Sequence, residues 1–471
     1  MVAPPDAHGP SGSPHHEADL DPSDPASELP TSAERRTGEP ADEGGAPARA
    51  APWRSYKETI AALSGRIVEA QRNLSVLPLL RWDAGVEEAF RASRGRELPR
   101  VNHDWWAKLE LEFNPDDKIA EFEQIARDAK RELGEADPFA LILEATAIEY
   151  RDVVHLLLAR GKRDFYHRSR ALWGSPKDSL PGWNLQVRDV GFALYGALAH
   201  IASSPALAPG QSDISAQSAV EILRSRFDSV FGDSVVEVVV DDDLLADASA
   251  VGDRVKLRAG ATFCMQELDV LEVHEGWVHI ATTLNGQAQP VARWLAKGPP
   301  RTTKTQEGIA VLTEVFSGRS YVQRARKLND RLLAIDKAED GADFLEVYEW
   351  YRTEGYDEDE CFSHTRRVFR GGVLHGGAPF TKDISYAKGL VLCFDFLKNA
   401  VLQGRLDQIP MLFAGKVAHE DVPVLAEHVA DGIVRAPRFL PPPFRDPRGL
   451  AVWLSYSSLL EKRCREQADG A

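Results

Sequence analysis

The stretch HEGWVHIATTLNGQAQP, residues 274–290, together with TQEGIA at residues 305–310, is the part of the sequence around which we expect the chain to be organised. It places His274, Glu275 and His279 on an apolar segment that is long enough to form a buried helix. In zinc proteases two histidines on one helix bind the metal, and the glutamate between them lies beside the water that the metal activates. The sequence therefore predicts a metal site on this helix.

The spacing of the two histidines departs from the zinc-protease pattern, because they stand five residues apart rather than four. On a regular α-helix, five steps leave the side chains of His274 and His279 about 140° apart around the axis. A one-residue π-bulge would bring both imidazoles to one face, and Gly276 within the spacing tolerates distorted backbone. The alternative is two histidines with satisfied hydrogen bonds, and Glu275 paired with a neighbouring basic side chain.

Glu307, on the next predicted helix, supplies the further ligand that such a site needs. A carboxylate one short helical element downstream is the usual third ligand when two histidines come from one helix, and the fourth position stays open for water. We therefore expect His274, His279 and Glu307 to hold one zinc ion (Zn²⁺). Glu314 lies seven residues beyond Glu307 on nearly the same helix face. There it would either accept a hydrogen bond from a ligand histidine or stand exposed to solvent.

The motifs HEGWVH, LNGQAQP (residues 284–290) and TQEGIA are accompanied by two longer segments, ARGKRDFYHRSRALWGSP (159–176) and RVFRGGVLHGGAPFTKDISY (367–386). Together they resemble the QEGLA-motif proteins, a bacterial group labelled by modulation of flavohaemoglobin expression. That group is similar to the microtubule-associated tyrosine carboxypeptidases of animals. The resemblance extends from about residue 55 onward, and Ile309 replaces the leucine of the family tag.

The resemblance implies a zinc-dependent peptidase-like fold with an HExxxH helix. On this sequence it implies metal ligands at His274, His279 and Glu307 and a general base at Glu275. The function expected from it is a zinc metallopeptidase of the carboxypeptidase kind, which removes a C-terminal residue, with an aromatic residue as one candidate. Its partner would be the C-terminus of a peptide or protein.

The segment from residue 367 to 386 carries a second set of candidate residues around the glycine-rich loop GGVLHGG. Beyond metal and base, a zinc hydrolase needs a cation for a substrate carboxylate and a donor for the oxyanion. Mainly on the family resemblance, we assign Arg370 and Arg367 to substrate binding and Lys382 and Tyr386 to catalysis. The alternative is that Arg370 and Lys382 form surface ion pairs and that Tyr386 packs in the core.

Composition bounds the class of protein. With 471 residues, 43% hydrophobic and 27% charged, the chain can bury a sizeable core in one large or two closely packed domains. Its four cysteines lack metal-ligand spacing and predict no disulfide scaffold, which indicates a reducing, cytoplasmic location. The formal net charge of −16 argues against nonspecific nucleic-acid binding. The start lacks the features of a signal peptide, and no apolar run approaches the roughly 20 residues of a membrane span.

Three regions are expected along the chain. Residues 1–52 are acidic and rich in proline, glycine and alanine, so we interpret them as a disordered tail. Residues 53–230 have helical periodicity and form the N-terminal part of the catalytic region, and residues 231–471 form the part with the metal site. Within the latter, SVVEVVVDDD (234–243) and DRVKLRA (253–259) predict two strands of a small sheet beside the site helix. The fold class expected is α+β, predominantly helical and zinc-metallopeptidase-like.

Local signals give further element boundaries. Asn114 and Pro115 are suited to a helix start, and the site helix is expected to begin near Gln266. Asn285 and Gly286 are good helix-end residues, after which a loop, PPRTTKT (299–305), is expected to lead to the Glu307 helix. Thr381 is suited to cap a helix that includes Tyr386.

Two other functions stay open at this point. One is a zinc hydrolase of a non-peptide amide or ester, which the same groups would serve equally well. The other is a non-catalytic metal-binding regulatory protein with a structural site. Glu275 favours an enzyme, because a purely structural site does not require it. The sequence leaves the physiological substrate, exo- versus endo-cleavage and the oligomeric state open.

Overall fold

The computed structural model describes residues 47–202, 204–208, 210–242, 244 and 247–469. Most of the tail predicted for residues 1–52 lies outside these residues, and the last residues of that range belong to helix α1 (Pro47–Ala70). From Ala51 onward the chain forms one compact unit. The division of the catalytic region at residue 230 stays a prediction.

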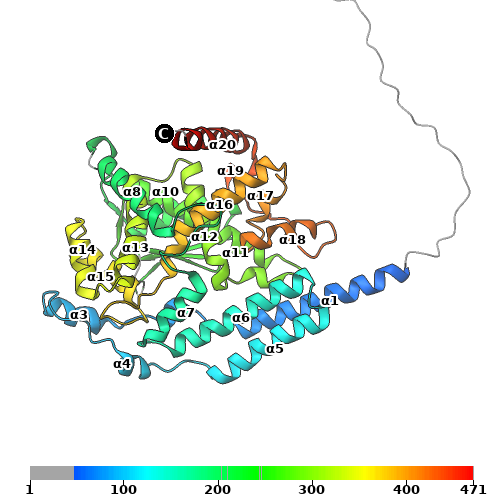
Figure 1. The fold of residues 1–471 in the computed structure, drawn as a ribbon, viewed down its shortest axis with the longest axis horizontal. Coiled ribbons are helices and arrows are strands. Elements are labelled where there is room, and N and C mark those ends of the chain that lie inside the picture. The colour runs from blue at the N-terminus through cyan, green and yellow to red at the C-terminus, as the bar shows by residue number, and fades with distance from the viewer. Residues whose placement is uncertain (1–46, 203, 209, 243, 245–246, 470–471) are drawn as a thin grey trace, which may run out of the picture. The chain divides into compact units, whose positions relative to one another are not determined.

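The described chain is predominantly helical, as predicted, with small sheets near its middle (Figure 1). The helices before the sheet are α1, α2 (Val76–Leu79), α3 (Ala84–Ala92), α4 (His103–Ala107), α5 (Pro115–Leu133), α6 (Pro138–Leu158), α7 (Arg163–Trp173), α8 (Val187–Ala202), η1 (Pro205–Leu207) and α9 (Ala216–Phe231). The helices after it are α10 (Met265–Leu271), η2 (Glu272–Ile280), α11 (Ala281–Gln287), η3 (Arg293–Ala296), α12 (Pro300–Phe316), α13 (Val322–Glu339), α14 (Phe344–Thr353), α15 (Glu358–Phe369), η4 (Lys382–Ile384), α16 (Ser385–Leu402), α17 (Gln408–Met411), η5 (His419–Asp421), α18 (Val422–Glu427), α19 (Pro442–Arg445) and α20 (Arg448–Asp469).

The N-terminal helices begin where the sequence predicts. Asn114 caps α5, because its side chain accepts hydrogen bonds from the backbone of Asp116 and Asp117, and Pro115 occupies the first helical position. The apolar residues at helical spacing are buried, among them Ile60 of α1 and Phe122 of α5. Figure 1 shows α1, α5 and α6 running side by side. The predicted helical periodicity of this half is confirmed.

The sheet is a three-stranded one in the order β2–β4–β3, with strands β2 (Glu237–Asp241), β3 (Ala248–Val251) and β4 (Arg254–Arg258). Strand β2 runs parallel to β4 and β3 runs antiparallel to it. Two short strands, β1 (Ile214–Ser215) and β5 (Thr262–Phe263), form a separate antiparallel pair. Strands β2 and β4 were predicted, whereas β3 was not, because its four residues are mostly small. Edge strand β3 packs against η2.

The site helix, formed by α10, η2 and α11 in succession, lies between two buried apolar clusters. Its Leu268 and Ile280 belong to the smaller cluster with Phe227 of α9 and Leu257 of β4. Its Val278 belongs to the larger cluster, which holds most of the buried apolar residues of the other helices. The helix begins at Met265, within one residue of the prediction, and Glu267 accepts a hydrogen bond from the backbone of Cys264. Packing on both sides fixes its rotation.

One predicted loop is wrong. PPRTTKT is not a loop, because α12 begins at Pro300, where proline at the first helical position costs no hydrogen bond. The helix end predicted at Asn285 and Gly286 is confirmed within two residues, since both lie in the last turn of α11, which ends at Gln287. Gly286 is needed there because a Cβ would overlap the backbone of Leu295. The side-chain amide of Asn285 donates to the carbonyls of Phe413 and Phe439, each at 2.8 Å.

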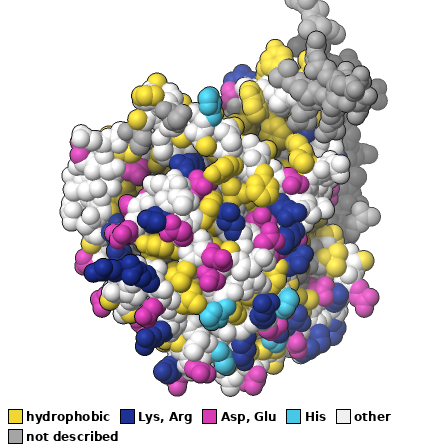
Figure 2. All heavy atoms as spheres, turned by 60° about the vertical axis from the view of Figure 1, so that its left-hand side comes forward, with side chains coloured by type: hydrophobic (Ala, Val, Ile, Leu, Met, Phe, Trp, Pro, Cys, Tyr) yellow, Lys and Arg dark blue, Asp and Glu magenta, His cyan; other side chains and the backbone are white. Residues whose placement is uncertain are grey.

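Thr381 stands before η4, which leads into α16 with Tyr386, but its side chain makes no capping hydrogen bond. Its hydroxyl instead lies 2.9 Å from the hydroxyl of Ser169 on α7. None of the described helices combines the length and the apolar character that a membrane crossing would require. Figure 2 shows acidic and basic side chains interspersed over the face that Figure 1 has at its left.

Candidate metal centre

The helix that carries both histidines is a π-helix from Glu272 to Ile280. Its hydrogen bonds join residues five apart, and the backbone N–H of Ala281, for instance, bonds to the carbonyl of Gly276. Residues five apart therefore lie on one face, and the rings of His274 and His279 have centroids 4.8 Å apart. The predicted π distortion is confirmed and extends over two turns.

Gly276 has a packing role beyond its conformational freedom. A Cβ at this position would overlap the ring of Phe227, which is fully buried on α9. The absence of a side chain thus lets α9 and the smaller apolar cluster contact the backbone of the π-helix directly. The opposite face of the same turn is left for the histidines.

Glu307 of α12 completes the predicted trio. Its Oε2 lies 3.4 Å from Nε2 of His274 and 3.7 Å from Nε2 of His279. The donor atoms of the three residues all lie within 4.8 Å of one another. Tetrahedral zinc with bonds of about 2.0–2.2 Å would hold its ligand atoms about 3.3–3.6 Å apart. Oε2 of Glu307 is also buried without a hydrogen-bond partner among the described residues, so the trio fits a metal ion.

Glu314 fixes the orientation of His274. The Nδ1–H of His274 donates to Oε1 of the fully buried Glu314 at 2.7 Å, and the guanidinium of Arg324 donates to the same oxygen at 3.1 Å. Since a carboxylate only accepts, the proton sits on Nδ1 and the lone pair of Nε2 points to Glu307. Burial lowers the pKa of His274, but the neighbouring Glu307 and Glu314 carboxylates outweigh it and raise the pKa to about 9, so Nε2 would offer its lone pair to a metal ion only after losing a proton. The hydrogen-bonding role expected of Glu314 is confirmed.

Glu275 follows the first histidine but is not one of the three donors. Its Oε2 accepts a hydrogen bond from the backbone N–H of Ala250 on β3 at 3.1 Å. Edge strand β3 therefore holds this carboxylate beside the π-helix. The carboxylate is kept in place without being a ligand.

Lys382 and Tyr386 lie at the metal centre. The ammonium of Lys382 is 3.6 Å from Oε1 of Glu307, and the Tyr386 ring stacks on that of His274 with centroids 6.3 Å apart. Burial and the charge of Glu307 raise the pKa of Tyr386, so its hydroxyl keeps its proton at neutral pH. Lys382 also helps, against the effect of burial, to hold the pKa of Glu307 well below its usual range.

The two predicted arginines lie in a cluster next to these residues. Arg367 donates to Asp383 at 2.8 Å. The guanidinium of Arg370 lies over the ring of Phe380 at 5.4 Å, and its Nε and Nη2 are buried without a partner among the described residues. Burial and the charge of Arg367 lower the pKa of Arg370 to about 9. Both arginines lie near Asp383, which follows Lys382 in the sequence, and neither contacts His274 or His279 among the described contacts.

Sequence reasoning missed Arg331 and Lys416. The guanidinium of Arg331 lies 5.6 Å from the centre of the Tyr386 ring, and its Nε is buried without a described partner. Lys416 donates to the carbonyl of His279 at 2.9 Å. Arg331 follows helical periodicity like any charged helix residue, and Lys416 stands in no motif. Neither offered a local signal, since both act across long stretches of chain.

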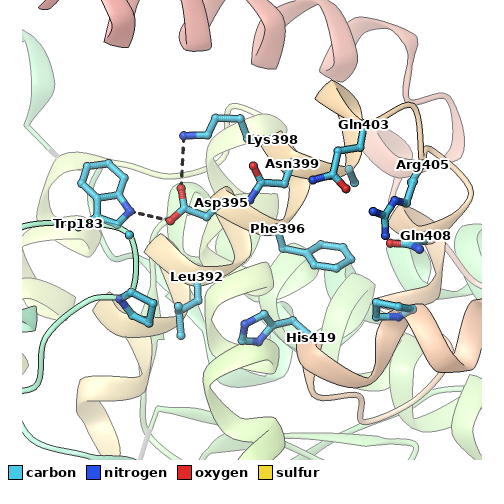
Figure 3. A pocket seen from close by; sticks show the side chains of 14 residues that line it. Trp183, Leu392, Asp395, Phe396, Lys398, Asn399, Gln403, Arg405, Gln408 and His419 are labelled. Atoms are coloured by element: carbon cyan, nitrogen blue, oxygen red, sulfur yellow. Dashed lines mark hydrogen bonds and ion pairs between the residues drawn. The ribbon is translucent and has the colours of Figure 1, made fainter. Parts of the chain in front are cut away.

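A separate pocket of about 480 Å³ is lined by residues of α16, of the loop at residues 181–183 and of the segment from residue 403 to 423 (Figure 3). The indole N–H of Trp183 donates to Asp395 at 2.6 Å, and Lys398 lies 3.5 Å from the same carboxylate. None of the metal-site candidates lines this pocket. Its His419 contacts α12, since the backbone N–H of His419 donates to the hydroxyl of Thr305 at 3.0 Å.

Comparison with known proteins gives the family. A search of curated proteins returned no match. The family model described as microtubule-associated tyrosine carboxypeptidase matches residues 88–462, a range that contains the π-helix, α12 and the arginine cluster. Because the match spans most of the chain, this protein belongs to the microtubule-associated tyrosine carboxypeptidase family.

Proposed function

We propose that this protein is a zinc-dependent carboxypeptidase that removes a C-terminal residue, tyrosine or another aromatic, from a peptide or protein. The observation that carries the proposal is the convergence of His274, His279 and Glu307, with Oε2 of Glu307 buried and otherwise unpartnered. Family membership supports peptide chemistry over hydrolysis of another amide or an ester. The free, buried thiols of Cys264, Cys361 and Cys393 agree with a reducing, cytoplasmic setting.

Each residue of the centre has a role in this proposal. His274, His279 and Glu307 would hold the ion, and Glu314 would keep His274 in the correct tautomer. A zinc ion at this position would supply a Lewis acid for the scissile carbonyl and lower the pKa of a water molecule. Glu275 would take the proton from the attacking water and return it to the leaving amine.

Lys382 and Tyr386 would act on the negative charge that develops at the carbonyl oxygen. Tyr386 keeps its proton because its pKa is raised, so it can donate a hydrogen bond to that oxygen. The ammonium of Lys382 faces Glu307, and from there it can also stabilise the negative charge on the carbonyl oxygen of the substrate. Tyr386 is held in place because α16 packs directly on α12, and Lys382 lies on η4, which leads straight into α16.

The arginine cluster would bind the carboxylate at the end of the substrate. Arg331, Arg367 and Arg370 approach one another, while Asp383 neutralises one charge through Arg367. The cluster thus keeps a net positive charge, and buried N–H groups of Arg331 and Arg370 find no partner in the part of the chain that the structure describes. A terminal carboxylate can accept two parallel hydrogen bonds from a guanidinium, which explains why an exopeptidase would use such a cluster.

Metal analysis and peptide cleavage test the proposal. Purified protein is expected to contain close to one zinc per chain and to release tyrosine from peptides that end in it. His274→Ala and His279→Ala should lose both the metal and the activity. Full metal retention in both variants would remove the site, and cuts at internal bonds would overturn the carboxypeptidase assignment.

A further inference from the structure

Lys416 makes an unusual set of contacts for a lysine. It lies between α17 and η5, where its backbone N–H donates to the carbonyl of Leu295 at 2.7 Å. Its ammonium donates to the carbonyl of His279 at 2.9 Å, the hydroxyl of Thr282 at 3.0 Å and the side-chain amide of Gln306 at 3.1 Å. An ammonium has three N–H donors, so all of them are used.

The three acceptors belong to the two segments that carry the metal ligands. His279 is itself a ligand candidate at the end of the π-helix, and Thr282 stands in the first turn of α11. Gln306 directly precedes Glu307 on α12. The hydroxyl of Thr282 is 2.9 Å from the Gln306 side-chain oxygen, so the network joins the segments twice.

The carbonyl of His279 marks where the π-helix returns to α-helix. Besides Lys416, it accepts from the hydroxyl of Thr283 at 2.8 Å, and the hydroxyl of Thr282 lies 3.1 Å away. A carbonyl oxygen has two lone pairs, so the ammonium of Lys416 and the hydroxyl of Thr283 are enough to saturate it. Side-chain donors thus hold the carbonyl of the second histidine near the end of the π-helix. The wide turn that aligns the histidines is held from outside the helix.

The chemistry of the contact argues against a role in packing alone. All three acceptors are uncharged, and the ammonium is not exposed, so the protein bears the cost of desolvating a cation without a directly paired carboxylate. An apolar side chain of similar length would fill the same space without that cost. A cation is required only if its three directed hydrogen bonds matter.

We propose that Lys416 is a positioning residue, which sets the metal-binding geometry by tying the backbone of His279 to the α12 turn that carries Glu307. This inference rests on the metal site of the proposed function. Lys416 acts through the ligands and does not touch the metal itself. Partners that orient metal ligands typically change metal affinity about 10- to 100-fold when they are removed.

The test compares Lys416→Met with Lys118→Met in the full-length protein. Lys118 is a matched control, because its half-buried ammonium also donates to a backbone carbonyl, that of Ala70 on α1, at 2.6 Å. Both Lys118 and Ala70 are far from the metal ligands in sequence. Zinc affinity is measured by competition with a chelator, and ligand geometry by the visible absorption spectrum of the cobalt-loaded protein. Lys416→Met should bind zinc about 10- to 100-fold more weakly and show a changed cobalt spectrum, whereas Lys118→Met should match the wild type.

A second variant keeps the proposal testable if Lys416→Met does not fold. Gln306→Met removes the acceptor on α12 and should also weaken zinc binding, and combining it with Lys416→Met should cost less than the sum of the two. If either single variant folds and keeps the zinc affinity and cobalt spectrum of the wild type, the positioning role of Lys416 is overturned, whereas the proposed function is not affected. Failure of the wild-type protein to bind zinc would refute the proposed function, and this inference with it.

Discussion

Gly308 of α12 and Gly389 of α16 face each other so closely that a Cβ on either would overlap the backbone of the opposite helix. The two helices therefore meet at their backbones. This contact lies one residue from Glu307 and three from Tyr386, so it sets how near the ligand and the proposed oxyanion donor come to each other. The glycine of the TQEGIA motif is explained by this approach.

Gly308→Ala should separate the helices. Overpacking of this kind costs about 1–3 kcal/mol, and the displacement of Glu307 should weaken zinc binding as well. Thermal unfolding and zinc content measure the two effects. Gly196→Ala on α8 is the control, because a Cβ there meets nothing within 4 Å and alanine should stabilise that helix slightly. A Gly308→Ala protein as stable and as zinc-rich as the wild type would contradict the argument.

Glu314→Gln should weaken zinc binding about 10- to 100-fold, since the neutral amide holds the Nδ1–H of His274 less strongly and leaves Arg324 without its counter-charge. Chelator competition measures the affinity. Glu349→Gln is a suitable control, because Glu349 pairs with Arg352 on the exposed side of α14. Unchanged affinity would mean that Glu314 serves the fold and not the ligand.

Glu275→Gln should keep the zinc and lose hydrolysis by roughly 10²- to 10⁴-fold, the usual contribution of a positioned acid–base group. The amide still offers an oxygen to the N–H of Ala250, so the local structure should persist. Zinc content and turnover of a peptide ending in tyrosine are measured on the same preparation. Loss of metal would show that the roles of Glu275 and Glu307 are exchanged.

A free carboxylate should be essential in the substrate, so amidation of the peptide end should abolish cleavage. Arg370→Ala and Arg331→Ala should each reduce turnover of the free acid, by roughly 2 to 5 kcal/mol in transition-state free energy if the remaining charge is left unpaired. Arg352→Ala on α14, where Arg352 pairs with Glu349 on the exposed side, should have little effect. Equal cleavage of acid and amide would count against the cluster.

Glu149 should make stability depend on pH. Its carboxylate accepts the backbone N–H of Arg301 at the start of α12, and burial raises its pKa from 4.5 to about 7. A raised carboxyl pKa contributes stability that is fully present below pH 4.5 and is lost as the pH rises through 7. Glu149→Gln removes this loss, so urea unfolding should show the variant gaining up to about 3 kcal/mol on the wild type between pH 4 and 8. A constant difference across that range would refute the assignment.

Much of the centre could be predicted from the sequence because its signals are local. His274, Glu275 and His279 lie close together in the sequence, and a shared metal at their spacing calls for the π distortion that the structure has. Glu307 follows on the next long helix. The roles of these residues in metal binding and catalysis stay predictions, whereas their convergence is a property of the fold.

The errors and omissions have a common physical origin. Pro300 was assigned to a loop because proline breaks helix interiors, although its missing N–H costs nothing at a helix start. Asn285 is a residue type common at helix ends, yet its side-chain amide has a further role here, because it donates hydrogen bonds to the carbonyls of Phe413 and Phe439. Lys416 and Arg331 act on partners far away in sequence. Contacts between residues so far apart in the sequence produce no local periodicity or motif spacing from which they could be predicted.

The extra residue within the π-helix also sets the direction in which the side chains of the following helix, α11, point. Removing one residue between the histidines would give the four-residue spacing of the zinc-protease motif, and on a regular helix the two rings would again share a face. It would also turn Asn285 by about 100° away from the carbonyls of Phe413 and Phe439. The five-residue spacing of the histidines and the attachment of the C-terminal segment to Asn285 therefore depend on the same number of residues in the helix. A single-residue deletion between the histidines would alter both at once.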